Sequence, residues 1–287
     1  MTDPILLYQV DAFTRRLFAG NPAAVCVLTQ ALPRELCQAI AQENQLSETA
    51  FIQRRGEGYA IRWFTPTCEV DLCGHATLAA AYVVGEFLEP GCPVVRFASR
   101  QEQLQVRRQG DGWELDFPRW SLTPATAPAP LVSGLGITPQ EVWQTPRDLL
   151  VVVPSAEQVQ SLQPNLDQLA QLDSLGVIVT APGRQGVDFV SRFFAPRLGI
   201  PEDPVTGSAH CALAPYWSDR LGKTALYARQ LSARGGELWC RVTPDRVLIR
   251  GSAVCYLSGQ IHLPESTGAW ELFGSDRRPG WQPIQGE

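Results

Sequence analysis

Short apolar runs typical of β-strands recur along most of the 287-residue chain. Three stretches instead have the 3.6-residue periodicity of helices, at residues 33–44, 75–87 and 210–221. The runs VVRFASR, LQVRRQG and WELDFPRW alternate apolar and polar positions, which predicts antiparallel pairing, and ELWCRVTPDRVLIRG predicts a hairpin. The pattern therefore predicts a protein that contains both strands and helices.

A stretch rich in proline and alanine, SLTPATAPAPLVSGLG at residues 121–136, interrupts this pattern. Such a change of composition is typical of a connection between domains. We therefore predict a first domain over residues 1–120 and a second over residues 121–287, with a C-terminal segment that is able to pack back on the first. The tail from Gly274 is polar and contains glycine and proline, so we expect it to be loose.

The most informative pattern is an internal repeat. The sequence RWFTP at residues 62–66 recurs as RFFAP at residues 192–196, and each copy is followed by a glycine that begins a small-residue helical pattern. In this alignment, Cys73-Gly74-His75 corresponds to Thr206-Gly207-Ser208. A strand, a proline, a loop and a helix start that recur in the same order predict two related domains that face each other.

Two helix starts that face each other would form a binding site for an anion. The first N–H groups of a helix have no internal partner and lie at the positive end of the helix dipole. A glycine at this position, here Gly74 and Gly207, lets a carboxylate approach the backbone closely. The alternative is that both glycines only meet the steric needs of tight strand-to-helix turns, and the repeat favours the shared site.

Composition narrows the class of partner. The formal net charge is −5, and the lysines and arginines are scattered singly, which leaves no basic stripe for nucleic acid or an acidic membrane. No apolar run approaches the roughly 18 residues that a membrane span requires, and no secretory signal pattern is present. We therefore predict a cytoplasmic protein that binds a small molecule.

The chain has eight cysteines, several of them inside apolar strand-like or helix-like runs, so we predict reduced and mostly buried thiols. A zinc site needs Cys and His residues at ligand spacing. Here the nearest pairs are Cys68 with Cys73 and the adjacent His210 and Cys211, which point in different directions from a helix. We therefore predict no metal site, and we interpret His210 and Cys211 as packing residues.

Four segments resemble the signature stretches of the phenazine-biosynthesis isomerase (PhzF-like) family: DAFTRRLFAGNPAAV, LSETAF, RWFTPTCEVDLCGHATLAAAYV and PEDPVTGSAHCALAPYW. The resemblance runs from Asp11 to about Gly259. It implies the α+β fold of diaminopimelate epimerase, in which two pseudo-symmetric domains each wrap a curved, mostly antiparallel sheet round a central helix. It also implies an isomerase that acts as a homodimer without cofactor or metal.

The resemblance also implies roles for individual residues. The glutamate of LSETAF, here Glu48, would be the general acid/base that moves a proton between carbons of a small carboxylic acid, and Asp203 and His75 would be catalytic with it. His75 would also bind substrate, together with Asn21, Cys73, Gly74, Thr206, Gly207 and Ser208. From the residues alone, Glu48 could be a solvated glutamate, Asp203 a turn residue before Pro204, and His75 a core histidine.

One position departs from related racemases and epimerases, which use two opposed cysteines to remove and return a proton. Here Thr206 stands at the second position, and a hydroxyl is too weak an acid to replace a thiol near neutral pH. The sequence therefore favours an isomerase that shifts a proton and a double bond through Glu48. Two alternatives stay open: an epimerase or racemase that uses Cys73 with a carboxylate as second base, and a metabolite-binding protein without turnover.

Overall fold

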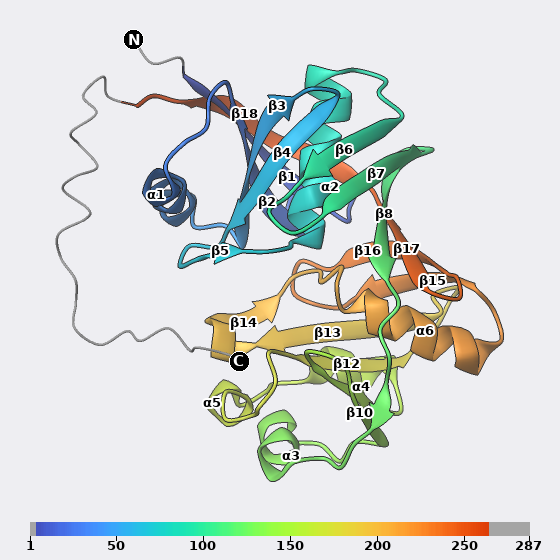
Figure 1. Ribbon diagram of the computed structural model, residues 1–287. Coiled ribbons are helices and arrows are strands. Elements are labelled where there is room, and N and C mark those ends of the chain that lie inside the picture. Colours follow the sequence, from blue (N-terminus) through green and yellow to red (C-terminus); the bar gives the residue numbers. More distant parts are fainter. Residues whose placement is uncertain (1–3, 264–287) are drawn as a thin grey trace, which may run out of the picture.

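A computed structural model describes residues 4–263 of the chain. The tail from Gly274, predicted to be loose, lies outside these residues. Figure 1 shows two halves, one above the other, each with a curved sheet and one central helix. Within residues 4–263, every helix is too short or too polar to cross a lipid bilayer. All eight cysteines are free thiols, as predicted.

The first half wraps its sheet round helix α2 (Gly74–Val83), which continues as a π-helical turn, η1 (Val84–Leu88). Helix α2 is buried on almost every face because alanines and other small residues let the strands pack close to it. Helix α1 (Arg34–Asn44) covers the outer face. The strands are β1 (Ile5–Ala12), β2 (Asn21–Leu28), β3 (Glu48–Arg55), β4 (Gly58–Phe64), β5 (Glu69–Val70), β6 (Val94–Ala98), β7 (Gln103–Gln109) and β8 (Gly112–Pro118).

The second half wraps its sheet round helix α6 (His210–Leu221). Three short helices, α3 (Ala129–Leu135), α4 (Ala156–Ser161) and α5 (Leu166–Leu169), contribute to a separate core on the outer face of this sheet. The strands are β9 (Thr123–Pro124), β10 (Glu141–Gln144), β11 (Leu149–Val152), β12 (Val177–Pro182), β13 (Phe189–Ala195), β14 (Ile200–Asp203), β15 (Ala225–Gln230), β16 (Gly236–Val242) and β17 (Arg246–Gly251). A 3-10 turn, η2 (Pro196–Leu198), precedes β14.

The two halves share a continuous sheet. Strand β8 pairs antiparallel with β17, and the last described strand, β18 (Ala253–Ile261), returns to the first half and pairs antiparallel with β1. In Figure 1, β18 is the red strand beside the blue strands of the N-terminal half. The division of the chain at residue 120 stays a prediction, because the pairing of β8 with β17 runs across it.

Most of the elements predicted from the pattern are confirmed, including the three helices, the antiparallel strands β6 to β8 and the hairpin of β16 and β17. The prediction of a linker at residues 121–136 was wrong over most of its length. Strand β9 pairs with β10, and α3 buries Leu131 and Leu135 in the outer core of the second half. The apolar residues among the prolines and alanines therefore pack against the second sheet.

The internal repeat is also a structural repeat. Strands β2 to β5 and helix α2 follow the same order and pairing as strands β11 to β14 and helix α6. Arg62 forms a bidentate ion pair with Glu69 (2.7 and 3.0 Å), and Arg192 forms the same pair with Glu202 (2.7 and 2.9 Å). The structure thus has the predicted architecture of two pseudo-symmetric sheets, each around a central helix.

Candidate active site

The two helix starts meet at the centre of the molecule. A Cβ atom built on Gly74 would lie 3.8 Å from the Cα of Gly207, and one built on Gly207 would lie 3.9 Å from the Cα of Gly74. The rings of Phe117 and Phe13 lie beside them, 3.3 Å from a Cβ on Gly74 and 3.4 Å from one on Gly207. Glycine therefore lets the two ends approach closely, and the prediction that they face each other is confirmed.

The second helix starts later than the repeat predicts. Helix α2 begins at Gly74, but α6 begins at His210, and a tighter turn precedes it in which the His210 N–H donates to the Gly207 carbonyl (3.0 Å). Nδ1 of the His210 imidazole donates a hydrogen bond to the Thr206 carbonyl (2.9 Å), so this carbonyl is bonded to a side chain. Burial lowers the pKa of His210 to about 4, so this ring is a neutral part of the core.

A cavity of 390 Å³ lies in front of the two helix starts. Its walls combine side chains from both halves, and the apolar part includes Phe117, Trp120 and Phe193. Of the site residues predicted from the sequence, all but Asn21 line this cavity: Glu48, Cys73, Gly74, His75, Asp203, Thr206, Gly207 and Ser208. Asn21 lies behind the wall, where it contacts His75 and Asp203.

Glu48 and His75 form a contact pair at the wall of this cavity. Glu48 is the first residue of β3, and its Oε2 lies 3.1 Å from Nε2 of the buried His75. The other ring nitrogen, Nδ1, faces the Asn21 amide nitrogen (3.2 Å) and the Cys73 sulfur (3.5 Å). Burial works to lower the pKa of His75, but the Glu48 carboxylate beside the ring raises it well above its ordinary value. A carboxylate and an imidazole, both able to exchange protons, therefore lie in contact at the cavity wall.

Asp203 connects this pair to the second half. Its Oδ1 accepts from the Asn21 amide (2.7 Å), and its Oδ2 accepts from the Thr206 hydroxyl (2.5 Å). The Gln230 side chain fixes Thr206 in turn, because it accepts from the Thr206 N–H (2.9 Å) and donates to the hydroxyl (3.2 Å). Burial raises the pKa of Asp203 to about 6, with His75 opposing and Glu48 reinforcing the rise. Asp203 can therefore gain or lose a proton near neutral pH.

This raised pKa predicts how stability depends on pH. Because the pKa of Asp203 rises from its ordinary 3.8 to about 6 on folding, its stabilising effect is full below about pH 4 and is lost as the pH rises to about 6. The difference corresponds to about 3 kcal/mol. Asp203→Asn stays neutral, so its unfolding free energy should gain about 3 kcal/mol relative to wild type between about pH 4 and pH 7. Urea denaturation across this range measures the difference, and a constant difference would contradict the prediction.

Cys73 and its neighbours have the atoms of a metal site. In the described part of the chain, one group of Cys, His and carboxylate side chains is close enough to hold an ion: Glu48, Cys73 and His75, with donor atoms within 4.8 Å of one another. Spacing in the sequence did not reveal it, because Glu48 comes from a different strand. His75 lies between the other two side chains, 3.5 Å from the Cys73 sulfur and 3.1 Å from the Glu48 carboxylate. Burial raises the pKa of Cys73, and the Glu48 carboxylate raises it further. The Cys73 thiol therefore stays protonated near neutral pH.

The sequence did not predict a role for Arg147, which also lines the cavity. Its Nη2 donates to the Ser208 hydroxyl at 3.0 Å, and it forms an ion pair with the adjacent Asp148. The only signal in the sequence is that Arg147 and Asp148 precede the buried run LLVVV, much as Asn21 precedes the buried run AAVCV.

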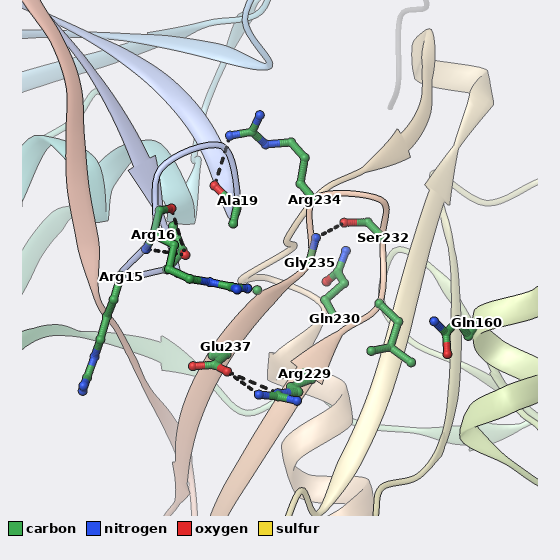
Figure 2. Close-up of a pocket in the computed structure, with 13 residues that line it drawn as sticks. Arg15, Arg16, Ala19, Gln160, Arg229, Gln230, Ser232, Arg234, Gly235 and Glu237 are labelled. Carbon is green, nitrogen blue, oxygen red and sulfur yellow. Dashed lines mark hydrogen bonds and ion pairs between the residues drawn. The ribbon is translucent and has the colours of Figure 1, made fainter.

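A larger cavity, of 510 Å³, lies on the other side of Gln230, where the loop of Arg15, Arg16 and Ala19 meets the hairpin of Ser232 and Arg234 (Figure 2). Two of its arginines are already bound: Arg229 to Glu237 at 2.7 Å and Arg234 to the Ala19 carbonyl at 3.0 Å. None of the site residues predicted from the sequence lines it. We therefore assign the candidate active site to the smaller cavity.

Comparisons with known proteins show the family and the fold of the chain. The family model PhzC-PhzF, described as phenazine biosynthesis-like protein, matches residues 10–259. An uncharacterized isomerase of Pseudomonas aeruginosa is 52% identical over 259 residues, which cover 90% of this chain and 99% of that protein. The crystal structure of a PhzF-family phenazine biosynthesis protein from Enterococcus faecalis is 45% identical, with a TM-score of 0.88 over 91% of this chain and 100% of that chain. A probable proline racemase from Agrobacterium radiobacter is 12% identical, with a TM-score of 0.61 over 92% of this chain and 95% of that chain, which shows a shared fold.

Proposed function

Because the chain belongs to the phenazine biosynthesis-like (PhzC-PhzF) family and is an isomerase, we propose that it shifts a proton, and with it a double bond, within a small carboxylic acid. The observation that carries the proposal is the contact between Glu48 and His75 at the cavity wall, at 3.1 Å, beside the two helix starts. The proposal is supported because a carboxylate is able to accept a proton, and backbone N–H groups beside it are able to stabilise negative charge. The proposed reaction uses these groups alone and no cofactor.

In the proposed reaction, Glu48 removes a proton from a carbon of the bound acid. The electron pair of the broken C–H bond forms a new double bond, the old double bond opens, and its far carbon takes the proton back from Glu48. The charge that develops on the substrate lies close to the N–H groups at Gly74 and Gly207, where the helix starts stabilise it. His75 holds the Glu48 carboxyl in place, and Asp203 orients a polar group of the substrate.

One observation favours a second candidate, an epimerase with Cys73 and Asp203 as opposed bases. Asp203 is bonded to Thr206, the residue that stands opposite Cys73 in the repeat, and its pKa of about 6 suits a base near neutral pH. The buried Cys73 thiol weighs against this candidate, because burial and the Glu48 carboxylate raise its pKa and disfavour the thiolate that such a mechanism needs.

Turnover in deuterium oxide tests the proposal. Wild-type protein incubated with a series of small unsaturated carboxylic acids should give a product in which the double bond has moved and one carbon carries deuterium, as seen by NMR. Deuterium at a stereocentre without any movement of the double bond would instead show epimerisation.

We also propose that the protein is a homodimer, as the family resemblance implies, and that it is cytoplasmic, as the sequence pattern predicts. Exposed apolar side chains gather beside β18, where Phe18, 70% exposed, packs edge-on against Tyr256 at 5.6 Å. Light scattering at micromolar concentration should therefore give twice the chain mass of 31.5 kDa. Phe18→Ser should weaken the dimer, while Leu221→Ser, at an exposed site on α6, should not. A wild-type monomer would contradict this part of the proposal.

A further inference from the structure

The proton-transfer scheme gives no role to Arg147, the cation in the second half of the cavity. Its Nη2 donates to the Ser208 hydroxyl at 3.0 Å. Its guanidinium carbon lies 5.3 Å from the ring centre of Trp120 and 5.9 Å from that of Phe193. These aromatic faces hold the guanidinium by cation–π contacts at the edge of the cavity. Its position is therefore fixed before any ligand binds.

Asp148 holds the other side of the guanidinium. This fully buried carboxylate accepts from Arg147 Nε at 3.1 Å and from Nη2 at 2.9 Å. The bonds of Arg147 to Asp148 and Ser208 use Nε and Nη2. Within residues 4–263, Nη1 has no hydrogen-bond partner, so it is available to a ligand. A guanidinium binds a carboxylate best when its planar donors are already oriented, so the pair with Asp148 prepares Arg147 for an anion.

The repeat shows how the two halves of the cavity differ. Ser208 is the counterpart of His75. His75 contacts a carboxylate, that of Glu48, whereas Ser208 contacts a cation, the guanidinium of Arg147. The counterpart of Glu48 is Gly176, because the next residue of each strand pairs with the matching phenylalanine of the repeat.

At Gly176 no acidic side chain fits. A Cβ there would lie 2.3 Å from the Phe193 ring and 3.1 Å from Asp148 Oδ1. The first half of the cavity therefore presents a carboxylate that can exchange protons, and the second half presents an oriented cation.

We propose that Arg147 and the Ser208 hydroxyl form a carboxylate-binding pair, which holds the acid group of the substrate and turns its reacting carbons toward Glu48. The orientation rests on the proposed isomerase function, whereas the binding of a carboxylate does not. The contact is charge-assisted and shielded by aromatic rings, so it distinguishes a carboxylate from a neutral amide of the same shape.

Binding of benzoate and of its neutral isostere benzamide, measured by isothermal titration calorimetry, tests the pair. Wild-type protein should bind benzoate about tenfold or more tightly than benzamide, and Arg147→Gln should abolish this preference. Arg197→Gln is the matched control. Arg197 is bound to the exposed Asp173 at 3.1 Å and does not line the cavity, so its loss changes the net charge equally and should leave the preference intact.

Arg147→Gln leaves Asp148 as a buried, unpaired charge and can unfold the protein for that reason alone. The double variant Arg147→Gln with Asp148→Asn removes both charges, so it should fold and still lack the preference for benzoate. A folded double variant that keeps the preference, or a wild-type protein without one, would overturn the proposal.

Glu48→Gln separates this inference from the proposed function. The variant should keep the preference for benzoate over benzamide, because Arg147 and Ser208 are unchanged and the substitution removes a negative charge from the cavity. If Glu48→Gln keeps both the preference for benzoate and full turnover, the isomerase mechanism fails while the carboxylate-binding pair stands.

Discussion

Glu48→Gln should lower turnover by at least ~100-fold while the fold and ligand binding persist. Glutamine is nearly isosteric with glutamate, and its amide oxygen can keep the 3.1 Å contact with His75 Nε2. The amide cannot accept the substrate proton, so deuterium incorporation should fall together with turnover. Steady-state kinetics and NMR in deuterium oxide measure both quantities, and circular dichroism checks the fold.

Cys73→Ser is the matched comparison, because Cys73 lies 3.5 Å from the same imidazole. Its turnover should stay within about tenfold of wild type, since the pKa of Cys73 is raised and its thiol carries no negative charge to lose. If Cys73→Ser loses more turnover than Glu48→Gln, the thiol carries the proton and the enzyme is an epimerase.

Alkylation gives an independent check on the same thiol. Cys68 is exposed and should react with iodoacetamide at neutral pH, whereas the buried Cys73 should react slowly because its raised pKa disfavours the thiolate. Peptide mass spectrometry distinguishes the two sites. Rapid modification of Cys73 that small carboxylates prevent would count against Glu48 as the base.

Arg192→Gln should lower the free energy of unfolding by about 3 kcal/mol or more. The Arg192 side chain is 11% exposed, and besides Glu202 it donates to the carbonyls of Val159 (3.2 Å) and Leu162 (2.8 Å). These carbonyls lie at the end of α4, where helix carbonyls lack internal partners. Removal of the arginine leaves several buried acceptors without a donor at once.

Arg62→Gln is the control that the repeat supplies. Arg62 is 31% exposed, it donates to a single carbonyl, that of Leu32 at 3.5 Å, and its partner Glu69 keeps a second arginine, Arg34, at 3.1 Å. We therefore expect a loss of about 1 kcal/mol. Urea denaturation of both variants measures the two losses, and equal losses would show that the buried carbonyls of α4 add nothing.

The fold could be predicted from the sequence because its signals are local. Helix α2 is a run of small residues behind a glycine, and the strand, loop and helix of the repeat are contiguous in each copy. The repeat also aligned Cys73 and His75 with Thr206 and Ser208, so these four site residues could be predicted from contiguous segments. The helical periodicity also predicted the start of α6 at His210, which is later than the repeat alone indicates.

Long-range contacts explain what the sequence did not predict about the site. Gln230 reaches Thr206 from another strand, and Arg147 reaches Ser208 across the turn before α6, so neither partnership leaves a pattern of spacing. Glu48 was placed only by its resemblance to a family motif, because the contact with His75 depends on how β3 passes α2. For the same reason, the sequence did not reveal that Glu48, Cys73 and His75 together have the donor atoms of a metal site.

The close approach of Gly74 and Gly207 has an electrostatic consequence. Gly74 begins α2 and Gly207 begins the turn that leads into α6, so the positive ends of the backbone dipoles of the two halves lie close together. These ends repel each other, and the continuous sheet of β8 and β17 holds them in place against that repulsion. In the proposed reaction, the negative charge that develops on the substrate beside these ends would offset the repulsion and so stabilise the contact between the two halves. The free energy of this charge stabilisation would therefore also contribute to the stability of the contact between the two halves.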